Sequence, residues 1–321
     1  MESGTHPDVP VRSAGGRAVG LPFLRAAALW ADTIKLHHSV FAMPFALMAA
    51  FLAGWHRPSG RPSAVQLVLI VLCMVAARSA AMTFNRIVDA TIDAANPRTA
   101  GRAIPTGRLS LGRARAFFAV CCVVFVAGTA GFRWLEGNPW PLRLAVPVLA
   151  YLCFYSYTKR FTRWSHFVLG SGIALSPPAA WLAVDPGSLG AAALVLTGAV
   201  MLWIGGFDIL YACQDASFDR RAGLHSLPAS VGIGAALWMA RAAHAATVVL
   251  LAALIPLTPL GAIYGIGVGA VAVLLAIENA LVRPGDLSRV NVAFFTINGM
   301  VSVLLGVAAI AELVLARSGA A

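Results

Sequence analysis

The chain has 321 residues, of which 59% are hydrophobic and only 12% are charged, and its mean hydropathy is +0.80. A soluble domain carries about 25% charged residues, so this composition excludes an ordinary soluble surface and favours one polytopic membrane domain. A net charge of +11 would indicate nucleic-acid binding in a soluble protein. The basic residues here lie mostly between apolar spans, as cytoplasmic loops require, and we therefore expect no nucleic-acid partner.

The first segment, residues 1–28, is rich in Gly, Pro and Arg and has little hydrophobic periodicity. We expect it to be a mobile cytoplasmic tail, followed by a single transmembrane domain over residues 29–321. Nine apolar spans fill this domain, and several approach the roughly 20 residues that cross a bilayer as a helix. They lie near 38–55, 66–85, 115–132, 142–158, 164–184, 191–213, 235–255, 258–281 and 291–315. The predicted fold class is an all-α polytopic membrane protein with about nine transmembrane helices.

The basic residues between the spans predict the orientation. With the N-terminal tail inside, the inner segments carry 17 Arg and Lys residues and the outer segments carry 5. Cytoplasmic loops show this excess under the positive-inside rule. We expect an integral protein of the inner (cell) membrane, with the second and sixth spans ending on the cytoplasmic side.

The second span ends in a charged stretch, NRIVDATIDAANPRTAGRAIPTG, over residues 85–107. Asn85, Asp89 and Asp93 follow one another at intervals of four residues. At 3.6 residues per turn they share one face of a helix. Like charges at this spacing destabilise a helix, and near lipid they cost more unless they are paired or solvated.

The sixth span ends in a second acidic stretch, DILYACQDASFD. Asp208, Asp215 and Asp219 lie at relative positions 0, +7 and +11, within roughly 20° of one direction on a helix, and Tyr211 lies beside them. The chain has only 13 acidic residues, so the concentration of five aspartates in these two stretches, on one side of the membrane, is the main functional signal. Two acidic stripes at the inner ends of two spans predict a cation site.

Carboxylates with few other ligands suit Mg²⁺, which keeps waters and takes phosphates as remaining ligands. Basic residues on the same side can hold phosphate oxygens, because Arg offers a bidentate fork and Lys a point charge. The candidates for these contacts, together with Tyr211, are Lys35, Arg98, Arg102, Lys159 and Arg160. We therefore predict one site in which the carboxylates bind Mg²⁺, the ion binds a diphosphate, and the basic side chains hold the remaining phosphate oxygens.

At these residues the sequence closely resembles the UbiA superfamily of intramembrane aromatic prenyltransferases. The first stretch resembles that family's motif N-x-x-x-D-x-x-x-D with its trailing N-P-R-T-x-x-R, and the second stretch resembles its second aspartate motif. KLHHSVFAMPFALMAAFLAGW is similar to the family's first span, and YSYTKRFT resembles its Tyr-x-x-x-Lys-Arg segment. The resemblance covers nearly everything after about residue 28.

The resemblance implies a nine-helix fold around a central cavity, Mg²⁺ as cofactor, a polyprenyl diphosphate donor and a small aromatic acceptor. It implies that Mg²⁺ is held by the catalytic residues Asn85, Asp89, Asp93, Asp208, Asp215 and Asp219. GLHSLP, from Gly223, resembles the 4-hydroxybenzoate polyprenyltransferase branch, which implies a role in ubiquinone biosynthesis. Some of that branch is linked to menaquinone made through futalosine, where the acceptor would be 1,4-dihydroxy-6-naphthoate.

A secondary transporter is the alternative of another class, since intramembrane acids also couple ion flow. A transporter favours acids at the middle of spans and broken helices in matching halves. Here the motif acids lie at one interface, and Glu278 is the main deeper acid. Release of diphosphate from a prenyl diphosphate would distinguish the two classes.

Overall fold

The computed structural model describes Trp30 and residues 39–318. The predicted tail over residues 1–28 and the candidate Lys35 lie outside the described residues. The principal helices are α2 (Ser39–Trp55), α3 (Ala64–Val88), α4 (Ala90–Ala95), α5 (Leu111–Leu135), α6 (Trp140–Thr158), α7 (Ser165–Ala174), α8 (Ser176–Val184), α9 (Ala191–Ala212), α10 (Ala216–Arg221), α11 (Leu227–Val231), α12 (Ile233–Ala253), α13 (Ala262–Leu281), α14 (Val290–Val292) and α15 (Asn298–Ser318). The predicted all-α class is confirmed.

Each predicted span coincides with a helix or with two consecutive helices. Within the described residues, seven helical stretches are long and apolar enough to cross a membrane. The other two predicted spans are α2, which is apolar but only 17 residues long, and α6, a 19-residue helix with Arg143 near its start. The chain is therefore an integral membrane protein, and the predicted number of spans is close to the observed one.

Local sequence signals fix where these helices begin and break. Ser63 and Gln66 form a reciprocal capping box at the start of α3, with Ser63 Oγ accepting from the Gln66 amide at 3.0 Å. The span near 164–184 is broken at Leu175 into α7 and α8, because Pro177 and Pro178 cannot donate the backbone hydrogen bonds of a continuous helix.

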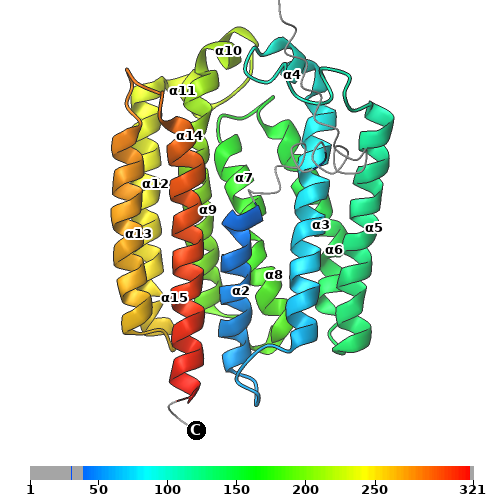
Figure 1. Ribbon diagram of the computed structural model, residues 1–321, viewed down its shortest axis with the longest axis vertical. Coiled ribbons are helices and arrows are strands. Elements are labelled where there is room, and N and C mark those ends of the chain that lie inside the picture. The colour runs from blue at the N-terminus through cyan, green and yellow to red at the C-terminus, as the bar shows by residue number, and fades with distance from the viewer. Residues whose placement is uncertain (1–29, 31–38, 319–321) are drawn as a thin grey trace, which may run out of the picture.

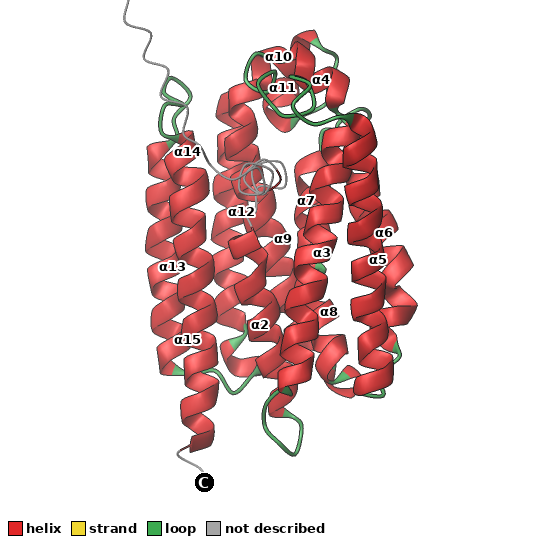
Figure 2. Cartoon of the chain, turned by 45° about the vertical axis from the view of Figure 1, so that its right-hand side comes forward, coloured by secondary structure: helices red, strands yellow, loops and turns green. Residues whose placement is uncertain are grey.

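The long helices stand side by side as a bundle, with α4, α10 and α11 gathered at one end (Figure 1, Figure 2). Glycines allow close approach of neighbouring helices. A Cβ on Gly170 of α7 would lie 2.5 Å from the Met201 carbonyl oxygen of α9, and one on Gly306 of α15 would lie 2.6 Å from Pro44 Cβ of α2. Helix α9, which carries the second acidic motif, is thereby held tightly against α7.

A cavity of about 180 Å³ lies between α2, α3, α5, α6, α7 and α8. Its wall is almost wholly apolar, with side chains such as Met74, Phe125 and Leu152. Arg78 and Tyr155 are polar exceptions in that wall. An apolar chamber thus lies between these helices, and the resemblance implied a central cavity.

Candidate active site

The two acidic motifs meet at one end of the bundle. The first lies at the end of α3 and in α4, and the second runs from the end of α9 into α10, and Figure 1 shows both segments together at that end. They are more than 100 residues apart in sequence, and Arg98 joins them through Asp215. The sequence prediction that both motifs lie on the same side is confirmed for the described residues.

The first motif continues the helical register of α3. Helix α3 ends at Val88, yet the Asp89 amide donates to Asn85 O at 2.9 Å and the Asp93 amide donates to Asp89 O at 2.8 Å. The three side chains therefore share a face, as their spacing predicted. Asn85 Nδ2 also donates to Asp89 Oδ2 at 3.0 Å, which orients that carboxylate.

Asp89 is almost completely buried, with 2% exposure, and contacts two cations. Lys159 Nζ donates to Asp89 Oδ2 at 2.5 Å, and Arg160 Nη2 donates to Asp89 Oδ1 at 3.1 Å. Both cations follow α6, which ends at Thr158. The His225 amide donates to the Lys159 carbonyl at 2.7 Å, so the loop after α10 holds this corner in place.

Asp93 is also buried, with 4% exposure. Arg102 Nη1 donates to Asp93 Oδ1 at 2.6 Å. Asp93 Oδ2 accepts no hydrogen bond, and Arg86 Nη1 lies 3.9 Å from it. A buried carboxylate oxygen without a hydrogen bond raises the free energy of the folded protein unless another partner binds it.

The second motif does not form one continuous α-helical stripe, and that sequence prediction is wrong. Helix α9 ends at Ala212, and a 3₁₀ turn over Cys213–Asp215 separates it from α10. The tighter turn changes the helical phase, so the three aspartates have different partners. Asp208 contacts His166, Asp215 contacts Arg98, and Asp219 lies beside Ser226.

Arg98 links the two motifs. Its guanidinium forms a two-pronged contact with Asp215, in which Nε donates to Oδ1 at 2.8 Å and Nη2 donates to Oδ2. Its Nη1 donates to the Tyr211 hydroxyl at 3.0 Å, and Asn96 Nδ2 donates to Asp215 Oδ1 at 3.0 Å. Burial alone would lower the pKa of Arg98, but the contact with Asp215 raises it above the usual value. Arg98 therefore stays charged.

Two polar partners in this site were missed by sequence reasoning. Asn96, which donates to Asp215, lies inside the first acidic stretch two residues before Arg98, and this position in the sequence could have identified it. His166 gave none, because it is 42 residues from Asp208, which its Nδ1 contacts at 2.7 Å. The Leu227 amide donates to His166 Nε2 at 3.2 Å, so the ring proton is on Nδ1 and is donated to Asp208.

A π-helical turn over Ala293–Ile297 packs against Tyr211. Phe294, on this turn, packs against the Tyr211 ring with centroids 4.3 Å apart. Asn298 Nδ2 donates to the Phe294 carbonyl at 3.2 Å and to Glu278 Oε1 at 2.7 Å. Such turns are common at functional sites. Here the buried Glu278 orients Asn298, and Asn298 in turn fixes the backbone of Phe294, which contacts the Tyr211 ring.

The described residues contain no group of three or more His, Cys, Asp or Glu side chains that surrounds a single ion position. The motif residues nevertheless offer carboxylate and amide oxygens, which are the ligands that Mg²⁺ takes. Asp93 Oδ2 is buried and accepts no hydrogen bond. These ligands suit a Mg²⁺ ion that is coordinated partly by the protein and partly by an anionic ligand, rather than one coordinated by the protein alone.

Comparisons with known proteins point to one family. The model of the UbiA prenyltransferase family matches residues 42–300. The chain is 31% identical over 172 residues to the 4-hydroxybenzoate octaprenyltransferase of Pseudomonas fluorescens (strain SBW25), covering 54% of this chain. The matched stretch spans only 56% of the length of that relative.

Solved structures share the fold over most of the chain. A UbiA homologue from Aeropyrum pernix K1 is 30% identical, with a TM-score of 0.75 over 87% of this chain and 98% of that chain. A UbiA homologue from Archaeoglobus fulgidus bound to GPP and Mg²⁺ is 19% identical, with a TM-score of 0.66 over 89% of this chain and 99% of that chain. Because the family match covers well over half of the sequence, the chain belongs to the UbiA prenyltransferase family.

Proposed function

We propose that this protein transfers a polyprenyl group from a polyprenyl diphosphate to a small aromatic acceptor, in a reaction that depends on Mg²⁺. The observation that carries the proposal is the juxtaposition of two aspartate motifs and a set of basic side chains at one end of an apolar chamber. The relative from Pseudomonas fluorescens bears the name of such an enzyme, and this supports the same reaction class here.

Asn85, Asp89 and Asp93 on one side, and Asp208, Asp215 and Asp219 on the other, would hold Mg²⁺ together with the donor diphosphate. When bound, the ion supplies Lewis-acid neutralisation of the charge that develops on the leaving group. The unbonded oxygen of Asp93 and the all-oxygen donor set support this role. The homologue from Archaeoglobus fulgidus binds GPP and Mg²⁺ on the same fold.

The basic side chains would hold the diphosphate oxygens. Arg98, Arg102, Lys159 and Arg160 already lie beside the carboxylates, and Lys35 is a further candidate from the sequence. Preorganised cations around a leaving group lower the barrier because their orientation costs nothing during the reaction. Tyr211, hydrogen-bonded to Arg98, would fix the orientation of that guanidinium.

The proposed reaction breaks the allylic C–O bond, and diphosphate leaves with the electron pair. The ring carbon ortho to the acceptor hydroxyl then forms the new C–C bond, and loss of its proton restores aromaticity. An apolar chamber favours this step because it keeps water away from the allylic cation. We place the site on the cytoplasmic side of the inner membrane, on the strength of the distribution of Arg and Lys between the spans.

Membranes containing the protein provide the test. Incubation with a polyprenyl diphosphate and Mg²⁺ should release diphosphate and give a prenylated product by mass spectrometry when the right acceptor is present. The acceptor panel compares 4-hydroxybenzoate with 1,4-dihydroxy-6-naphthoate, so the product also decides between the two quinone pathways. EDTA should stop turnover and added Mg²⁺ should restore it. Absence of diphosphate release with every acceptor would contradict the proposal and favour a transporter.

A further inference from the structure

We propose that the buried Glu278 of α13 is a positioning residue that keeps Arg98, a proposed ligand of the donor diphosphate, in its orientation. The inference rests on the proposed function and extends it to a residue outside the aspartate motifs. Glu278 is the main acid that the sequence places deep in a span, and a transporter would use an acid at such a position to couple the flow of an ion. The contacts of its side chain distinguish the two roles.

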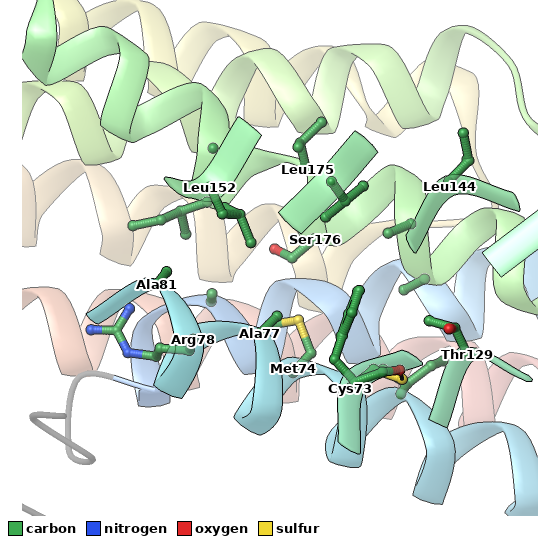
Figure 3. A pocket seen from close by; sticks show the side chains of 18 of the residues that line it. Cys73, Met74, Ala77, Arg78, Ala81, Thr129, Leu144, Leu152, Leu175 and Ser176 are labelled. Atoms are coloured by element: carbon green, nitrogen blue, oxygen red, sulfur yellow. Dashed lines mark hydrogen bonds between the residues drawn. The ribbon is translucent and has the colours of Figure 1, made fainter. Parts of the chain in front are cut away.

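Glu278 is separated from water and from the chamber. Its side chain is 0% exposed, and it is not among the residues that line the chamber drawn in Figure 3. His244 Nδ1 lies 3.8 Å from Glu278 Oε2, but this nitrogen accepts a hydrogen bond from Asn279 Nδ2 at 2.8 Å. Acids that serve ion flow line a pathway for the ion. The surroundings of Glu278 instead favour a role in hydrogen bonding.

Asn298 is the hydrogen-bond partner of Glu278 among the described residues. Its Nδ2 donates to Glu278 Oε1 at 2.7 Å, and its Oδ1 accepts from Trp203 Nε1 at 2.7 Å. All three side chains are buried, with exposures of 1% or less. A hydrogen bond in such a place resists displacement, because each group alone would be buried without a partner. Asn298 thus ties α13 and α15 to α9, the helix that carries the start of the second motif.

The same amide group fixes the π-helical turn over Ala293–Ile297. Asn298 Nδ2 donates to the carbonyl oxygens of Ala293 and Phe294, both at 3.2 Å. A π turn is a rare interruption of the α-helical hydrogen-bond pattern, so its persistence depends on further partners for its backbone groups. The hydrogen bond to Glu278 orients the amide toward these carbonyls, and its loss would weaken the hold on the turn.

The π turn connects this network to the candidate active site. Phe294 packs against the Tyr211 ring with centroids 4.3 Å apart. The Tyr211 hydroxyl accepts from Arg98 Nη1 at 3.0 Å, and the guanidinium carbon lies 5.1 Å from the centroid of the Tyr211 ring. A shift of Phe294 would therefore move the ring that orients Arg98. Glu278 influences the donor site through this series of contacts, by its hydrogen bond and not by its charge.

The test measures steady-state kinetics in membranes, with GPP as donor and whichever of 4-hydroxybenzoate and 1,4-dihydroxy-6-naphthoate the wild type prenylates. In Glu278→Ala we expect the KM for GPP to rise about 3- to 10-fold, the range of one hydrogen bond. The KM for the acceptor should stay unchanged. Glu278→Gln keeps an oxygen that accepts from Asn298 and should keep the wild-type KM. Asn298→Asp has nearly the same shape but lacks the amide donor, so it should resemble Glu278→Ala.

Glu312→Ala is the matched control. Glu312 also lies in a membrane-spanning helix, about 21 Å along the helix axis from Asn298 at 1.5 Å per residue. Its carboxylate accepts from the amides of Gly261 and Tyr264 at 2.7 and 2.9 Å. Its loss should lower the thermal stability in detergent but leave the KM for GPP unchanged. An equal rise in this KM in Glu312→Ala and Glu278→Ala would attribute both effects to stability and overturn the inference.

The comparison of the Glu278 variants separates hydrogen bonding from charge. A KM for GPP that rises equally in Glu278→Gln and Glu278→Ala, or that stays at the wild-type value in Glu278→Ala, would overturn the inference. A double-mutant cycle tests the contacts that lead to Arg98. In Tyr211→Phe the bond to Arg98 is already absent, so adding Glu278→Ala should raise the KM by a smaller factor than it does in the wild type. Multiplication of the two single effects would contradict the proposed connection.

Phe294→Leu covers the case in which the Glu278 variants do not fold. It removes the ring that contacts Tyr211 and keeps the side chains of Glu278 and Asn298, and it should also raise the KM for GPP. A wild-type KM in Phe294→Leu would overturn the inference and leave the proposed function intact. If the wild type transfers no prenyl group from GPP to either acceptor, the proposed function itself fails and the inference fails with it.

Discussion

At the scale of single residues, four of the five motif aspartates, Asp89, Asp93, Asp215 and Asp219, differ in the basic side chains that they contact. Asp89 contacts two cations and Asp215 contacts one, whereas Asp93 keeps one oxygen without a hydrogen bond. If all four help to hold a metal–diphosphate, no one of them can be replaced by its neighbours. Their individual removal is therefore the most direct test of a shared site.

We expect Asp89→Ala, Asp93→Ala, Asp215→Ala and Asp219→Ala each to lower the rate of prenyl transfer by about 100-fold or more, the usual effect of losing one preorganised electrostatic contact. Product formation in membranes, normalised to the amount of inserted protein, measures this. Asp286→Ala is the control, because Asp286 is an exposed acid outside both motifs, and it should retain full activity. Near-normal turnover in any two motif variants would contradict a two-motif metal site.

Arg98 is the residue where the geometry of the side chain matters as much as its charge. Arg98→Lys keeps the charge but loses the two-pronged contact with Asp215 and the bond to Tyr211. We expect the KM for the donor to rise about 10-fold, as for one lost charge-assisted hydrogen bond. Tyr211→Phe removes only one of these hydrogen bonds and should have the smaller effect. Steady-state kinetics with varied donor concentration measures both, and equal KM values in Arg98→Lys and wild type would show that charge alone suffices.

The motif aspartates could be found from sequence because their spacing matches helical periodicity and the chain has few acids. His166 could not be found in this way. Its role depends on its contact with Asp208, which lies on another helix 42 residues further along the chain.

At the scale of helices, hydropathy located the spans but not their interruptions. The 3₁₀ turn after α9 redirects Asp215 away from the face of Asp208, and the proline pair after Ser176 divides the fifth span. These interruptions have causes in the local sequence, but they change contacts between residues that are far apart in the sequence. The turn places Asp215 opposite Arg98, and the proline break leaves Ser176 Oγ facing the chamber without a partner.

The close packing of α7 on α9 gives a prediction about helix position. In Gly170→Ala the added Cβ would lie 2.5 Å from the Met201 carbonyl oxygen, and backbone atoms cannot move aside without separating the helices. We expect a loss of about 1–3 kcal/mol in stability and weaker transfer, because α7 carries His166 and α9 carries Asp208. Thermal unfolding in detergent measures the first effect.

Gly269→Ala is the matched control for this change. Gly269 also lies inside a membrane-spanning helix, but a Cβ there meets no atom within 4 Å. Its substitution should leave both thermal stability and transfer unchanged or slightly improved, since Ala is the better helix former. A similar loss in both variants would show that helix propensity, and not the contact between α7 and α9, is responsible.

At the scale of the whole molecule, the distribution of basic residues predicts an orientation. Ser59 in the loop between α2 and α3 and Arg221 at the end of α10 lie at opposite ends of the bundle, and both are exposed. In a cysteine-free background, Ser59→Cys should react with a membrane-impermeant maleimide in intact cells. Arg221→Cys should react only after the membrane is permeabilised. The reverse pattern would contradict the cytoplasmic placement of the site.

The cluster at the end of the bundle also has a property that no single contact shows. Among the described residues, its acidic members are Asp89, Asp93, Asp208, Asp215 and Asp219, and its basic members are Arg86, Arg98, Arg102, Lys159 and Arg160. Their formal charges cancel, so a diphosphate that arrives alone brings uncompensated negative charge, and a metal ion that arrives alone brings uncompensated positive charge. Under the proposed function, donor and metal must then bind with positive thermodynamic coupling, each raising the affinity of the other by the same factor.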